Sequence, residues 1–72
     1  MSDKTSQQEL KTLAHNIQQW QEAKHLSDAA LRKRFPDIGS DRTYKRILAG
    51  DLDELDVEVQ LAKYRAVWTL IE

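Results

Sequence analysis

The chain has no cysteine among its 72 residues, and it has only two glycines and one proline. The lack of cysteine excludes both a disulfide framework and a thiolate metal site. Few glycines and prolines leave few points at which a helix must break. The many Gln, Glu, Lys, Leu and Ala residues favour helix. We therefore expect an all-α chain of four helices with no sheet.

Long hydrophobic runs are also missing. No apolar stretch approaches the roughly 18 residues that a membrane span needs. The first part of the chain, residues 1–25, has no apolar core of the kind found in signal peptides. Together with the absence of cysteine, these features predict a cytoplasmic protein without a membrane partner.

Residue types that carry enzymatic chemistry are scarce. His15 and His25 stand ten residues apart, and no Gly-rich phosphate loop is present. The acidic run over residues 51–56 lacks the ordered ligands and the glycine of a calcium loop, and it suits the N-terminus of a helix instead. We expect His15 at the surface or at the edge of the core. We also expect no enzyme activity, no cofactor and no metal site.

The apolar pattern predicts one domain over residues 6–72 after a disordered tail at 1–5, with helices near 6–24, 27–35, 40–49 and 53–72. Pro36 should end the second helix at Phe35, and Gly50 should end the third. The expected N-caps precede each apolar pattern: Ser6 (in a capping box with Glu9), Ser27, Ser40 or Asp41, and Asp53, where Leu52 and Val57 would form a staple.

The expected core takes one apolar stripe from each helix. Its members are Leu13, Ile17, Leu31, Phe35, Tyr44, Ile47, Leu48, Leu61, Tyr64 and Trp68, and the first stripe also includes Leu10 and Ala14. The last helix carries a second apolar set, Val59, Ala62, Ala66 and Leu70. We expect this set to contact a twin chain or a following domain of a longer parent. The alternative is that Val59 and Leu70 are ordinary scattered surface residues.

Positive charge is concentrated in the middle of the chain, although the net charge is −1. Residues 24–46 carry seven basic and three acidic side chains, a net charge of +4. Residues 47–62 carry five acidic side chains and no basic one. A local basic surface on a neutral chain is compatible with a nucleic-acid partner.

The two short helices predicted between Leu26 and Gly50 form a helix-turn-helix, the DNA-reading unit of many small regulators. Arg42 in the first turn of the later helix can pair with guanine, and Lys45 and Arg46 can reach a base edge or a phosphate. The other candidate contacts to double-stranded DNA are Thr43, which can reach a thymine methyl or a phosphate, and the cations that suit phosphates: Lys24, Arg32, Lys33 and Arg34. Asp41 would repel a phosphate unless it caps the helix or accepts from a cytosine amine.

The stretch from Leu26 to Gly50, followed by an apolar helix, resembles the Cro/C1-type (lambda-repressor-like) helix-turn-helix domains. The likeness covers about residues 10–68 and is carried by Leu26-Ser27, Leu31, Ser40 to Thr43, Ile47 and Gly50. It implies base contacts by Asp41, Arg42 and Lys45 and backbone contacts by Ser27, Asp28, Thr43 and Arg46. Two features depart from the family: Arg32 stands where a small Ala is usual, and the turn at residues 36–39 is long for the pattern.

A second, narrower resemblance involves two segments: residues 47–51 and the later run Leu61-Ala62-Lys63-Tyr64-Arg65-Ala66-Val67. These residues are similar to the N-terminal domain of transposition-type AAA+ ATPases, such as phage Mu transposition protein B. In that family a helix-turn-helix precedes the ATPase core. The leading hypothesis is thus a DNA-binding module of a regulator or of a DNA-transposition ATPase. The alternative is a helical assembly module that uses the apolar face of the last helix.

Overall fold

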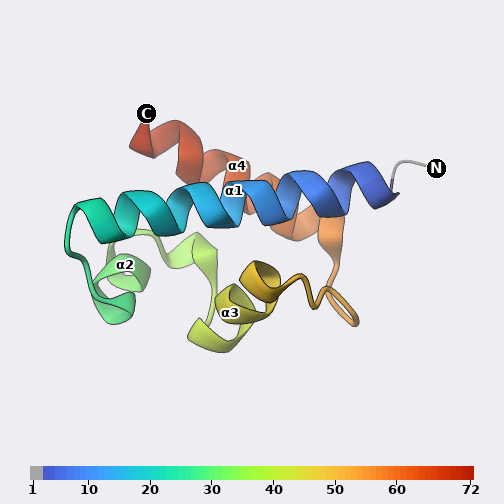
Figure 1. The fold of residues 1–72 in the computed structure, drawn as a ribbon, viewed down its shortest axis with the longest axis horizontal. Helices are drawn as coiled ribbons and strands as arrows, with labels where there is room; N and C mark the ends of the chain where they lie inside the picture. The colour runs from blue at the N-terminus through green and yellow to red at the C-terminus, as the bar shows by residue number, and fades with distance from the viewer. Residues whose placement is uncertain (1–2) are drawn as a thin grey trace.

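Four α-helices and one short 3-10 helix make up the part of the chain that the structure, a computed structural model, describes, which is residues 3–72 (Figure 1). The elements are α1 (Asp3–Ala23), α2 (Asp28–Arg34), η1 (Pro36–Ile38), α3 (Asp41–Ala49) and α4 (Val57–Ile71). These residues contain no β-strand, so the all-α prediction is confirmed. None of the helices described is long and apolar enough to cross a membrane.

The long helix α1 organises the molecule. In Figure 1 it runs along the longest axis, with α2 and α3 below it and α4 crossing behind it. α1 packs against α3 and α4, while η1 bridges α2 and α4. α1 therefore holds α3 directly, whereas α2 is held mainly by η1 and α3.

The start of α1 differs from the prediction. The helix begins at Asp3, so Ser6 lies inside it and the predicted capping box is wrong. The Ser6 hydroxyl donates to Glu58 Oε1 of α4 at 3.3 Å, and Glu9 pairs with Arg65. Ser6 and Glu9, the two side chains of the predicted capping box, thus bind residues of α4 instead. Residues 1 and 2 of the predicted tail lie outside the described residues.

The end of α1 is a left-handed cap without glycine. The His25 amide donates to Glu22 O at 3.1 Å and the Leu26 amide to Gln21 O at 3.0 Å, the two bonds of a Schellman motif. His25 holds φ at 57°, a left-handed conformation in which glycine is usual. The chain therefore turns sharply into α2 at some conformational cost.

The boundaries of α2 and α3 follow the prediction closely. Ser27 Oγ accepts from the Ala30 amide at 3.1 Å, and Ser40 Oγ accepts from the Thr43 amide at 3.2 Å. Ser40, rather than Asp41, is therefore the N-cap of α3. Gly50, with φ at 83°, ends this helix in the left-handed conformation as predicted.

The prediction for the start of α4 is wrong. Asp56 is the N-cap, because its Oδ1 accepts from the Val59 amide at 3.3 Å. Asp53 cannot start the helix, since Glu54 follows it with φ at 68°, in the left-handed region. The proposed staple between Leu52 and Val57 is therefore not a helix-entry motif. Residues 50–56 form a loop instead of an early helical turn.

The core is close to the predicted one but shifted at three positions. Its buried apolar members are Leu10, Ala14, Ile17, Leu31, Phe35, Ile38, Tyr44, Ile47, Leu61, Tyr64 and Val67. Leu13, Leu48 and Trp68 were predicted to be buried, yet they are only partly buried and pack around this core. Ile38 is fully buried because η1 folds the α2–α3 connection back against α4, where the Tyr64 hydroxyl donates to Ile38 O at 3.0 Å.

Candidate nucleic-acid interface

The exposed side of α3 carries three cations, two of which form ion pairs with acids. Tyr44 and Ile47 turn inward and are buried, which fixes the orientation of the helix. Arg42, Lys45 and Arg46 then lie on the opposite side, together with the small exposed residue Ala49, at the spacing of one helical face. Such a face combines hydrogen-bond donors with room for close approach.

Lys45 and Arg32 take part in ion pairs within the protein. Lys45 Nζ lies 3.2 Å from Asp41 Oδ2 and 3.9 Å from Asp28 Oδ2, and Arg32 Nη1 lies 3.5 Å from Asp41 Oδ1. We call these four residues the acid–base cluster. It joins α2 to α3. The predicted contacts Arg32, Asp41 and Lys45 are thus brought together, but each already has a partner.

A buried amide anchors this cluster to the core. Gln21 of α1, only 6% exposed, donates from Nε2 to Asp28 Oδ1 at 2.8 Å and to Leu26 O at 3.1 Å. Its Oε1 accepts from the Tyr44 hydroxyl at 3.3 Å. The hydrogen bond from Gln21 is the main reason that the pKa of Asp28 is lowered, with Lys45 adding to the effect against the opposing effect of burial. Burial raises the pKa of the Tyr44 phenol above its usual value, so this group stays a donor.

Arg46 is bound by the loop that follows α3. Its Nε lies 3.3 Å from Asp51 Oδ2, and its Nη2 donates to Asp53 O at 2.6 Å. The side chain is 26% exposed. Arg46 therefore closes the C-terminal end of α3 onto the loop, and a contact with DNA would compete with these bonds.

The cations of α2 differ in their surroundings. The Arg34 guanidinium lies 5.5 Å from the centre of the Trp20 ring and 5.8 Å from that of Phe35, within cation–π distance. Lys33 is exposed. Within the described residues neither Lys33 nor Arg42 forms an ion pair or a side-chain hydrogen bond. These two side chains are the ones most available to an external anion.

Ser27 and Thr43, two of the predicted DNA contacts, form hydrogen bonds at the N-termini of α2 and α3. Ser27 caps α2, as described above, and its hydroxyl oxygen is thereby used. The Thr43 hydroxyl oxygen accepts from the Ser40 hydroxyl at 3.1 Å in the first turn of α3. Both residues lie at helix N-termini, where backbone N–H groups and the helix dipole favour anions.

His15 and Gln21 are structural contacts that the sequence did not reveal. His15 Nε2 lies 2.9 Å from Leu48 O and so links α1 to the last turn of α3. No local pattern could have shown this bond, because the two residues are 33 positions apart. In the sequence Gln21 does not differ from the other polar residues of a Gln-rich helix, and only the fold brings it within hydrogen-bond distance of Asp28.

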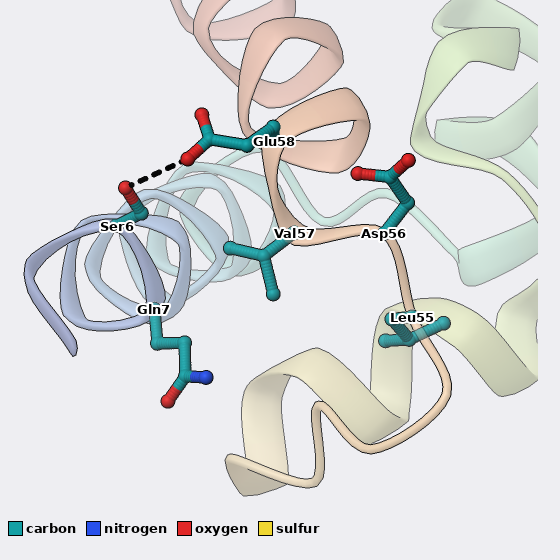
Figure 2. Close-up of a pocket in the computed structure, with 6 residues that line it drawn as sticks. All are labelled: Ser6, Gln7, Leu55, Asp56, Val57 and Glu58. Atoms are coloured by element: carbon teal, nitrogen blue, oxygen red, sulfur yellow. Dashed lines mark hydrogen bonds between the residues drawn. The ribbon is translucent and has the colours of Figure 1, made fainter. Parts of the chain in front are cut away.

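Two hollows of the surface are lined by residues outside the acid–base cluster. Figure 2 shows the larger one, about 260 Å³, between the N-terminal turns of α1 and α4, where Ser6, Asp56 and Glu58 surround Val57. A second hollow of about 250 Å³ lies beside Lys11 and Gly50. Among the described residues no group of three or more His, Cys, Asp or Glu side chains is arranged to hold a metal ion.

Comparison of the chain with protein-family models, with curated proteins and with solved structures finds no match in any of the three.

Proposed function

We propose that this domain binds double-stranded DNA through α2 and α3, as a lambda-repressor-like helix-turn-helix module. The observation that carries the proposal is the outer side of α3, where Arg42, Lys45 and Arg46 lie at the spacing of one helical face. Lys45 pairs with Asp41 and Arg46 with Asp51, whereas Arg42 forms no ion pair within the described residues. A recognition helix needs such a face, because long donors reach base edges in the major groove. The caps at Ser27 and Ser40 also match the positions on which the resemblance rests.

The roles of the cations follow from their partners. Arg42 forms no ion pair within the described residues, so it is the proposed base-reading side chain. Lys33, exposed on α2, is the proposed phosphate contact, which positions the protein without reading sequence. Arg34, Thr43 and Ser27 border these two positions as further backbone contacts.

The likeness to transposition-type ATPases supports a more specific proposal for the protein in which this DNA-binding domain acts. In that setting the domain is the DNA-gripping part of a transposition ATPase, and in the alternative setting it belongs to a regulator. Both need weak duplex binding by a single domain. For one copy with a net charge of −1, the expected dissociation constant is in the non-specific range, about 10⁻⁴ to 10⁻⁶ M.

The test is an NMR titration of the isotope-labelled chain with random-sequence duplex DNA at several salt concentrations. Amide shifts should concentrate in residues 27–34 and 40–46, and binding should weaken steeply as salt rises. Shifts confined to α4, or no shifts at about millimolar DNA, which lies above the non-specific range, would refute the proposal.

The exposed face of α4 favours a second function, assembly with another copy of the chain. Val59 is 46% exposed and Leu70 is 73% exposed, and the exposed Ala62 and Ala66 lie between them. Two antiparallel copies of this face would place Val59 near the partner's Leu70 around a centre of small residues, which is the self-complementarity of a two-fold interface.

Sedimentation at high protein concentration tests this second function, with Leu70→Glu as the variant. Self-association that the substitution abolishes would support it. A strictly monomeric chain would rule out assembly through a second copy. The DNA titration is independent of this outcome, so each function can fail alone.

A further inference from the structure

Two carboxylates lie among the cations of the surface that we propose for DNA. Asp28 stands in the first turn of α2 and Asp41 in the first turn of α3. Both contact Lys45, and Asp41 also lies beside Arg32. A surface built only to attract phosphate would not place negative charge at these positions.

We propose that Asp28 and Asp41 compete with DNA phosphates for Arg32 and Lys45, and that this internal competition limits the affinity of the domain for DNA. The inference rests on the proposed function and adds to it the residues that set the strength of binding. Carboxylate and phosphate oxygens accept the same hydrogen bonds from Lys and Arg, so one anion can replace the other.

The exposure of the cluster allows this exchange in the folded protein. The Lys45 side chain is 64% exposed and that of Arg32 is 36% exposed, so a phosphate can reach both without opening the core. Ion pairs at such exposure are weak, because water and salt screen them. The acids, however, keep their own negative charge next to any phosphate that approaches, and this repulsion lowers the net gain.

The geometry of Asp41 indicates that its pair with Arg32 is easily exchanged. Asp41 Oδ1 is shielded from solvent and accepts no hydrogen bond within the described residues, although Arg32 Nη1 lies 3.5 Å away. The interaction is therefore electrostatic attraction without a well-formed bond. Asp41 is also not needed as the cap of α3, because Ser40 fills that position. Its carboxylate can be neutralised while the helix keeps its cap.

The test is Asp41→Asn, measured by the fluorescence anisotropy of a labelled random-sequence duplex. The dissociation constant should fall about three- to tenfold at about 50 mM salt. The plot of log K against log salt should steepen by about 0.9, the value for one further phosphate contact. Thermal unfolding followed by circular dichroism verifies that the variant is folded. The matched control is Asp37→Asn, which makes the same charge change on η1, where Asp37 is exposed and forms no ion pair within the described residues.

Combined variants show whether the gain in DNA affinity depends on the cations that Asp41 holds. If Asp41 acts by holding Arg32 and Lys45, the improvement from Asp41→Asn should shrink in a Lys45→Ala background and disappear when Arg32 is also replaced by alanine. A gain no larger than that of Asp37→Asn, or one that survives the loss of both Arg32 and Lys45, overturns the inference while DNA binding stands. Weaker binding by Asp41→Asn also overturns it, because Asp41 would then contact DNA directly. If neither the wild type nor any variant binds the duplex, the proposed function itself fails and the inference falls with it.

Discussion

Replacing Gln21 by leucine tests the buried amide that joins α1, α2 and α3. The substitution keeps the approximate size of the side chain but removes the bonds to Asp28 Oδ1, Leu26 O and the Tyr44 hydroxyl. A neutral hydrogen bond contributes about 0.5–1.5 kcal/mol net, and one to a charged group about 1.5–3 kcal/mol. Asp28 is partly exposed and can turn to water, while the added apolar burial offsets part of the loss.

The expected loss in the free energy of unfolding is therefore about 1–3 kcal/mol, dominated by the Tyr44 hydroxyl and the Leu26 carbonyl left without Gln21. Urea denaturation measures this loss, and in a domain of this size each kcal/mol lowers Tm by about 4–8 °C. The matched control is Gln19→Leu, an exposed position on the same helix, where the change should stay within about 0.5 kcal/mol. Equal effects from the two substitutions would show that the amide network adds nothing to stability.

The pH dependence of the same pair gives a second measurement. Because the pKa of Asp28 is lowered in the folded state, mainly by Gln21, its contribution to stability is complete above the unfolded pKa of about 3.9. This contribution is lost as the pH falls through the lowered folded value. The stability difference between the wild type and Gln21→Leu should therefore shrink in acid. A difference that is constant from neutral pH to below about pH 3 would contradict the role given to Asp28.

Three further predictions concern the core, the strained cap and the proposed DNA contacts. Ile47→Ala should lower the free energy of unfolding by about 2–5 kcal/mol, because Ile47 is fully buried and its loss leaves a cavity; a urea-measured loss under about 1 kcal/mol would contradict this packing. His25→Gly should raise Tm slightly, since the left-handed φ of 57° is strained for histidine; a lower Tm would mean that the imidazole makes a stabilising contact. Arg42→Ala should weaken binding to a preferred duplex by about 1–3 kcal/mol. Lys33→Ala should instead weaken binding to all sequences alike and lower the slope of log K against log salt by about one unit. Equal losses of affinity from both substitutions, independent of sequence in anisotropy titrations, would show that α3 contacts only the DNA backbone.

The helices whose ends carry local chemistry were predictable from the sequence. Ser27, Ser40 and Gly50 act through bonds to residues three or four positions away, so a short stretch of sequence contains the whole interaction. The start of α4 was placed too early, although its capping chemistry is also local. Asp53 and Asp56 offer the same carboxylate, and only the backbone turn at Glu54 separates them.

Features that depend on distant partners could not be predicted. His15 bonds to Leu48 O and Gln21 to Asp28 only because α1 lies across the two short helices. The burial of Ile38 likewise depends on α4, which covers η1. The residue types of the candidate DNA surface were visible in the sequence, but the pairing of Lys45 with Asp41 and Asp28 decides which of its cations are available.

The acidic stretch after α3 explains how a chain with a net charge of −1 can still present a basic surface. Asp51 pairs with Arg46, Asp56 caps α4, and Glu58 accepts from Ser6. Three of the five acids between residues 47 and 62 therefore have structural partners within the protein. Their charge lies on the loop and on the first turn of α4, not on the outer face of α3. Asp56 and Glu58 form no ion pair with a cation of α3 within the described residues, whereas Asp51 pairs directly with Arg46 as Asp41 does with Lys45. Charges that do not touch are screened by salt, so Asp41 and Asp51 should affect a bound phosphate more than Asp56 or Glu58. The position of each acid, rather than the net charge, thus determines whether it opposes DNA binding.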